Sequence, residues 1–314
     1  MSHTRRFVLF VGPAIILAVA YLISFSRPSA AERAHAVKLT AAGDRFTYER
    51  ALRERSLLTM CGHTADALAP KLPEGYHIII RPPFVIAGDS DNDTLERAYF
   101  ENILPITNAL WRTYFDRRPL VPITIILLNN EQNFRDTARR LDAETVRSYD
   151  GYYQRSARRM VLNQSTGTGT LAHELCHALA EFDCPELPEW FDEGLASLHE
   201  ETSFTGDGLQ LVGLPNWRLR FVRDAMETEE LPTIEELLNR PSFRSHREGL
   251  SYAHAQALCL YLQDRGLLAA YYRKLKANVR NDPSGVQTLW ELVGIDDCES
   301  LERDFRQWVR RLRG

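Results

Sequence analysis

The chain has 314 residues, of which 44% are hydrophobic and 25% are charged, a composition typical of folded proteins and not of disordered ones. Its formal net charge of -4 provides no basic surplus to neutralise phosphates, which argues against nucleic-acid binding. The five cysteines include no CxxC pair, so neither a zinc ribbon nor a dense disulfide framework is indicated. Two roles remain possible for each cysteine. It is either a small buried hydrophobic residue or half of a disulfide, of which the chain could hold one or two.

The N-terminal segment comes first in chain order. Residues 7–25 carry no charge and follow Arg5 and Arg6. As a helix this segment would be about 28 Å long, close to the thickness of the hydrocarbon core of a bilayer. It predicts either an uncleaved transmembrane anchor, which we favour, or a signal peptide cleaved within residues 29–36. In the first case the rest of the chain lies on the outer or periplasmic side of the membrane, and in the second it is secreted.

The remaining sequence divides into a linker and one domain. Residues 1–31 form the signal anchor or signal peptide, residues 32–45 a polar, alanine-rich linker, and residues 46–314 the domain. Periodicity and turn residues predict several regular elements in the first part of this domain. They are helices over residues 46–60, 95–115 (bent or divided by Pro105) and 131–141, strands over 77–81, 84–87 and 123–128, and a hairpin over 152–162.

The later part of the domain is mostly helical. Apolar residues recur there at helical spacing, most clearly in residues 252–262, 267–275 and 301–312. Strands therefore concentrate in residues 46–165 and helices in residues 166–314. This segregation predicts an α+β fold.

The stretch TLAHELCHAL, residues 170–179, contains a chemically distinctive pattern. On a helix, His173 and His177 lie on one face with Cβ atoms about 5 to 6 Å apart, so both can reach one ion. Zinc accepts imidazole nitrogens, and Glu174 beside it can activate a water as general base. The rest of the helix is nearly all apolar, where unpaired polar groups are costly. The alternative is a pair of hydrogen-bonded core histidines without a metal.

Two carboxylates are candidates for a third ligand. Asp183 has the spacing of an HExxHxxGxxD site, but Ala180 stands where a glycine makes the turn, and alanine tolerates a left-handed turn poorly. Glu193 lies in PEWFDEGLASLHEE, residues 188–201, which predicts a second helix opened by a proline. The small residues Gly194 and Ala196 let another helix approach closely beside Glu193. We favour Glu193.

HELCH followed by PEWFDEGLA resembles the gluzincin metallopeptidases, in particular the bacterial peptidase MA-like domains with their HExxH...WxxEGxA pattern. The resemblance is specific over residues 167–197. It implies a thermolysin-like zincin domain, with a mixed sheet, an active-site helix and a helical C-terminal part. It further implies one zinc ion held by His173, His177 and Glu193, with Glu174 as the catalytic base.

The chain departs from the family pattern at two places. Many gluzincins have an aspartate four residues after the glutamate ligand, where it orients a histidine; Ser197 stands there, and Asp192 or a backbone carbonyl is the candidate replacement. The GxMEN motif of the aminopeptidase branch is absent upstream of HELCH, which favours an endopeptidase.

Charge that develops on the substrate oxygen needs a hydrogen-bond donor. Gluzincins often supply a tyrosine or histidine from a later helix, and Tyr252 is our choice, with His254 and His246 as alternatives. We interpret Trp217 as a packing anchor rather than a cleft wall. Residues 160–163 are a candidate edge strand along which an extended substrate pairs.

The sequence thus predicts an exported, membrane-anchored or secreted zinc metallopeptidase that acts on a peptide or protein substrate. A rival from another class is a non-catalytic exported binding module that retains a zinc-binding gluzincin fold. A hydrolase of non-peptide bonds is a third reading, because the residues constrain the reaction type more than the substrate.

Overall fold

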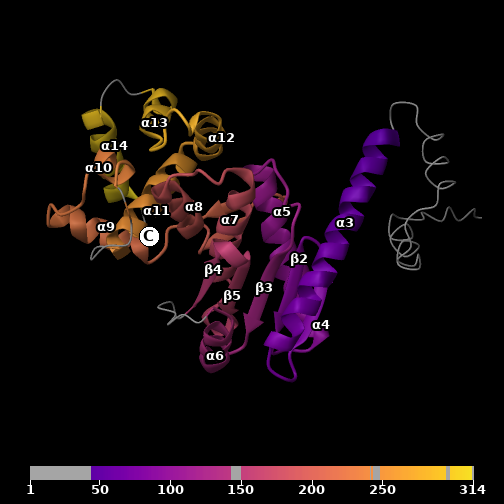
Figure 1. The fold of residues 1–314 in the computed structure, drawn as a ribbon. Helices are drawn as coiled ribbons and strands as arrows, with labels where there is room; N and C mark the ends of the chain where they lie inside the picture. Colours follow the sequence, from indigo (N-terminus) through magenta and orange to yellow (C-terminus); the bar gives the residue numbers. More distant parts are fainter. Residues whose placement is uncertain (1–43, 143–149, 241, 243–247, 295–297, 313–314) are drawn as a thin grey trace, which may run out of the picture. The chain divides into compact units, whose positions relative to one another are not determined.

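A computed structural model describes residues 44–142, 150–240, 242, 248–294 and 298–312. The chain divides into two units, Met1–Arg53 and Glu54–Gly314. In the first unit the described residues form the beginning of helix α3 (Asp44–Leu68). The other elements belong to the second unit (Figure 1).

The apolar segment over residues 7–25, predicted as an anchor or signal peptide, lies outside the described residues. So does the candidate cleavage region over residues 29–36. Within the described ranges, no helix combines the length and the apolar character that crossing a bilayer requires.

A mixed five-stranded sheet forms the first part of the second unit (Figure 1). Its three central strands run parallel, and an antiparallel strand lies at each edge. In spatial order the strands are β1 (His77–Arg81), β2 (Phe84–Gly88), β3 (Ile123–Leu128), β5 (Arg159–Asn163) and β4 (Gly151–Gln154). The predicted strands and the predicted hairpin are therefore confirmed.

Helices cover both faces of this sheet. Successive strand residues point to opposite faces. On one face, Val85 and Ile126 pack with buried side chains of α3 and α6 (Glu131–Asp142). On the other face, Ile86 and Ile125 join a larger core that also contains the helices of the later part of the chain. Burial on both faces explains why β3 reads as the uninterrupted apolar run ITIILL.

The predicted helix over residues 95–115 is divided into three segments. They are α4 (Asn92–Ala98), the π-helical segment η2 (Tyr99–Ile103) and α5 (Leu104–Thr113). The second division, between η2 and α5, falls just before Pro105, as predicted. Proline has no backbone N–H to donate, so the regular α-helical hydrogen bonding is interrupted at this point, where the π-helical segment joins α5.

The prediction that residues 160–163 form an edge strand is wrong. Strand β5 pairs with β3 on one side and with β4 on the other, so it is interior. The edge strand is β4, the first strand of the hairpin. Hairpin periodicity identifies two adjacent strands, but the parallel pairing of β5 with β3 is a long-range contact that decides which of them is outermost.

The later part of the chain is predominantly helical, with one added hairpin made of β6 (Thr202–Phe204) and β7 (Leu211–Gly213). Helix α7 (Gly169–Asp183) packs against α8 (Glu189–Leu198), and α8 packs against α11 (Glu248–Asp264). A Cβ atom added at Gly194 would lie 2.8 Å from the backbone oxygen of Ala255, so the glycine permits this close approach of α8 and α11.

Five further helices complete the core: α9 (Arg218–Glu227), α10 (Ile234–Leu238), α12 (Leu268–Asn278), α13 (Val286–Val293) and α14 (Cys298–Arg311). Short 3-10 segments occur at Ala69–Lys71, Arg155–Ala157 and Gln164–Thr166. The architecture is a mixed α and β one. Four cysteines, Cys61, Cys176, Cys184 and Cys259, are buried and free, which confirms their reading as small buried residues.

Candidate metal centre

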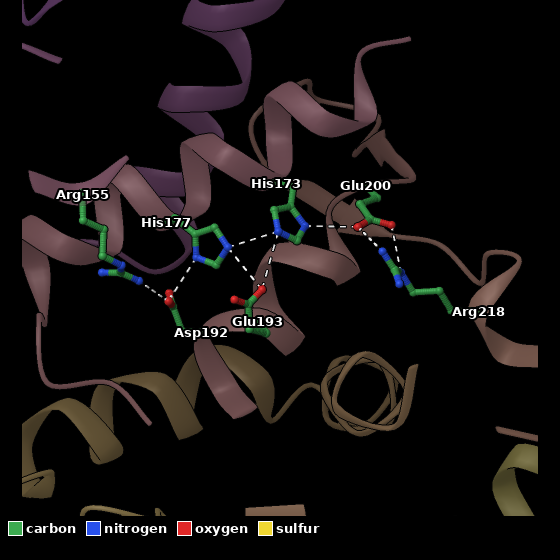
Figure 2. Close-up of polar contacts among 7 residues, drawn as sticks. All are labelled: Arg155, His173, His177, Asp192, Glu193, Glu200 and Arg218. Atoms are coloured by element: carbon green, nitrogen blue, oxygen red, sulfur yellow. Dashed lines mark hydrogen bonds and ion pairs between the residues drawn. The ribbon is translucent and has the colours of Figure 1, made fainter. Parts of the chain in front are cut away.

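Helices α7 and α8 bring three side chains to one point (Figure 2). The Nε2 atoms of His173 and His177, one turn apart on α7, are 3.1 Å apart. A carboxylate oxygen of Glu193, on α8, lies 3.6 Å from the first nitrogen and 3.3 Å from the second. The three residues predicted as metal ligands therefore lie together, with all three side chains largely buried.

The spacing of these atoms fits a zinc ion. A tetrahedral ion with bonds of about 2.0 to 2.1 Å places its ligand atoms about 3.3 Å from one another. The three observed separations, 3.1, 3.3 and 3.6 Å, surround this value. Two imidazoles and one carboxylate are also the donor set of known catalytic zinc sites with an open position.

The opposite side of each histidine ring faces a second carboxylate (Figure 2). Nδ1 of His177 lies 3.0 Å from Asp192, and Nδ1 of His173 lies 3.1 Å from Glu200. A carboxylate in this position favours the tautomer that carries its proton on Nδ1. Both Nε2 atoms then present lone pairs to each other and to Glu193. Three electron-pair donors this close together favour a cation between them.

Each of the two outer carboxylates is in turn held by an arginine (Figure 2). Arg155, just after β4, pairs with Asp192. Arg218, at the start of α9, donates two hydrogen bonds of 2.6 and 3.0 Å to the carboxylate of Glu200. This bidentate pair restricts the orientation of the Glu200 carboxylate, and the carboxylate in turn orients the imidazole ring of His173.

Glu174 lies on α7 between the two histidines and is 7% exposed. Burial raises the pKa of its carboxyl group, while the charges of His173 and His177 lower it in part. Four carboxylates (Glu174, Asp192, Glu193 and Glu200) share this centre with the guanidinium groups of Arg155 and Arg218. With neutral histidines and ionised acids the side chains leave a net charge of -2, which a divalent cation would neutralise.

The pKa values of the histidines reflect the same excess of negative charge. Burial lowers the pKa of His173, but hydrogen bonds with Glu193 and Glu200 outweigh burial and raise it to about 9. Burial also opposes protonation of His177, yet Asp192 and Glu193 raise its pKa well above the ordinary value. The surrounding acids therefore favour positive charge at this point, whether a proton or a metal ion supplies it.

The alternative third ligand, Asp183, lies elsewhere. It is the last residue of α7, and its carboxylate accepts hydrogen bonds from the backbone of Asp116 and Arg117 and from Tyr272 and Lys276. The chain does not turn back after Ala180, so Asp183 anchors the end of the helix instead.

The three candidate oxyanion donors have different positions. Tyr252, on α11, is half-buried, and its ring lies 5.8 Å from the guanidinium carbon of Arg218. His254 is 1% exposed and packs against Phe305 of α14, so it faces the core. His246 lies outside the described residues.

Sequence reasoning missed Glu200, Arg155 and Arg218 as partners of the centre. Glu200 lies within the same PEWFDEGLASLHEE stretch, but it follows the end of α8, so helical spacing gives no signal for it. The interpretation of Trp217 as a packing anchor is wrong, since its side chain is 58% exposed. It precedes the first turn of α9, whose buried face begins at Leu219.

Comparison with protein-family models and with curated protein sequences gives no match for this chain.

Proposed function

We propose that the chain is a zinc-dependent metallopeptidase, an endopeptidase with a thermolysin-like zincin fold. The observation that supports this best is the convergence of His173, His177 and Glu193, with each ring backed by a carboxylate. Both Nε2 atoms are turned toward each other and toward Glu193.

Zinc at this place would act as a Lewis acid and lower the pKa of a coordinated water to about 7. Glu174 is the general base: its carboxylate takes a proton from the attacking water and delivers one to the leaving amide nitrogen as the peptide C–N bond breaks. Its burial strengthens it as a base, because burial raises its pKa toward the working pH. The Tyr252 hydroxyl would donate a hydrogen bond to the carbonyl oxygen as charge develops there.

The location follows from the sequence. The uncharged segment over residues 7–25 would anchor the enzyme in a membrane with the domain on the outer or periplasmic side, or would direct its secretion. The substrate would then be a peptide or protein present outside the cytoplasm.

The first experiment measures metal content and proteolysis together. The full chain, purified in mild detergent, is analysed for bound metals as wild type and as Glu193→Gln, Glu174→Gln and the control Glu227→Gln, an exposed acid on α9. We expect about one zinc per chain in the wild type, weaker binding in Glu193→Gln, and unchanged zinc in Glu174→Gln. Casein cleavage should fall by about 10²-fold or more in Glu174→Gln.

The outcomes separate the competing readings. If the wild type binds no zinc, the zinc proposal is wrong, and His173 and His177 are hydrogen-bonded core residues without a metal. Zinc binding without cleavage of any peptide would favour the non-catalytic binding module. Loss of both zinc and activity in Glu227→Gln would mean that the variants act through folding.

A further inference from the structure

A pocket of about 230 Å³ lies next to the metal centre. Glu200 belongs to both, since its carboxylate faces His173 and the residue also lines the pocket. The other walls come from the first turn of α7, from α5 and from the segment between α8 and β6. The pocket has the size of one amino-acid side chain, and Glu200 connects it to the candidate metal centre.

The walls carry negative charge and no positive charge. Glu200 and Glu201 line the pocket together, and no lysine or arginine does. Glu201 is exposed, and no described residue binds its carboxylate. His199, also in the wall, is fully buried, and burial lowers its pKa to about 3, so it stays neutral at pH 7.

The remaining lining suits an alkyl chain that ends in a polar head. Ile106, Ala172 and Leu214 provide apolar contacts, while Thr168 and Thr202 add hydroxyl groups that can accept hydrogen bonds. Lysine and arginine have this form, an apolar stem with a charged end. An aspartate or glutamate side chain would instead meet two carboxylates of its own sign.

Two features oppose a cation, and neither is decisive. The first turn of α7 presents the positive end of a helix dipole, which disfavours a nearby cation. Arg218 already neutralises much of the charge of Glu200. Glu201 has no such partner in the described part of the chain, so it is the residue that decides the preference.

We propose that this pocket is the subsite for a lysine or arginine side chain of the substrate peptide, with Glu201 binding the cationic head. This assignment rests on the proposed peptidase function. It gives the enzyme a preference for cleavage sites next to basic residues.

The first test compares peptides that differ at one residue. Internally quenched peptides, acetylated and amidated at their ends, carry lysine, norleucine or glutamate at each position around the cleavage site. We expect kcat/KM to be about tenfold higher for lysine than for norleucine at one position, and lowest for glutamate. In Glu201→Gln the lysine-to-norleucine ratio should fall toward one, and in Glu227→Gln it should stay at the wild-type value. Cleavage without this preference would overturn the subsite and leave the peptidase function standing.

The second test does not need cleavage. Calorimetric titration of the full chain uses N-acetyl-lysine amide, N-acetyl-norleucine amide and leucine amide with a free α-amino group. The subsite requires binding of the lysine compound at least about fivefold tighter than the norleucine compound, and loss of this difference in Glu201→Gln. Equal binding of leucine amide would assign the pocket to a peptide N-terminus and overturn the side-chain reading. Lysine binding with no cleavage of any peptide would support the pocket while the proposed function fails.

Discussion

The ring of His177 is oriented by protein side chains as well as by the zinc ion that we propose it binds. Asp192 faces its Nδ1 at 3.0 Å, and Arg155 fixes Asp192 from the other side. Carboxylates behind a metal-binding histidine orient the ring and increase its basicity, and their loss typically weakens metal binding by 10- to 100-fold.

Asp192→Asn tests this arrangement. The amide keeps the size of the side chain but removes its charge, so we expect zinc affinity to fall by about 10- to 100-fold, as measured by competition with a chelator. Glu227→Gln, at an exposed acid, is the control for the loss of one negative charge. Affinity within about twofold of the wild type would show that Asp192 serves only the fold.

The three proposed ligands could be predicted from the sequence, and so could Asp192 as a candidate partner of a histidine, whereas Glu200, Arg155 and Arg218 could not. His173 and His177 follow from helical spacing inside one element, and Glu193 from the small residues beside it. Glu200 lies beyond the end of α8, and Arg218 follows the β6–β7 hairpin. The contacts of these two residues depend on how segments distant in sequence pack, and no local pattern encodes that.

At the scale of elements, helix α8 determines where Glu193, the proposed third ligand, lies. It packs against both α7 and α11, and Gly194 is a point of tight contact with α11. A Cβ atom there would lie 2.8 Å from the Ala255 oxygen and 3.0 Å from the Cys259 sulfur. Glu193 precedes this contact directly, so the position of α8 sets the position of its carboxylate.

Gly194→Ala should therefore move α8. We expect the free energy of unfolding in urea to fall by about 1 to 3 kcal/mol because of overpacking. Zinc affinity should fall with it, because Glu193 shifts. Gly249→Ala is the control: it lies on α11, and a Cβ atom there would meet no atom of the described residues within 4 Å, so alanine should be neutral or stabilising by up to about 1 kcal/mol. Equal stability of the two variants would contradict the tight contact.

The elements themselves were the most predictable level of the fold. Helices and strands follow from periods of 3.6 and 2, which are local, and Pro105 correctly indicated a division in its helix. The order of β4 and β5 was not predictable in the same way. Both strands of a hairpin look alike in sequence, and only the long-range pairing with β3 places β5 inside the sheet.

At the scale of the whole molecule, two buried histidines connect separate parts of the core. His199 contacts Tyr114 at the end of α5, and His254 packs against Phe305 of α14. Burial lowers the pKa of each from its ordinary value of 6.5 to about 3. The unfolded chain therefore binds more protons than the folded chain between these two values. Stability contributed by neutral His199 and His254 is fully present above pH 6.5 and is lost as the pH falls below it.

His254→Leu isolates this contribution. Neither ring nitrogen of His254 has a hydrogen-bond partner among the described residues, so leucine should be tolerated at pH 7.5. Between pH 6.5 and pH 5 the wild type should lose about 1.5 kcal/mol more of its free energy of unfolding than the variant does, measured in urea at each pH. Acid also weakens the proposed zinc centre, but both proteins carry the same centre, so its effect cancels in the difference. Parallel pH profiles would mean that His254 is already accessible to protons in the folded chain.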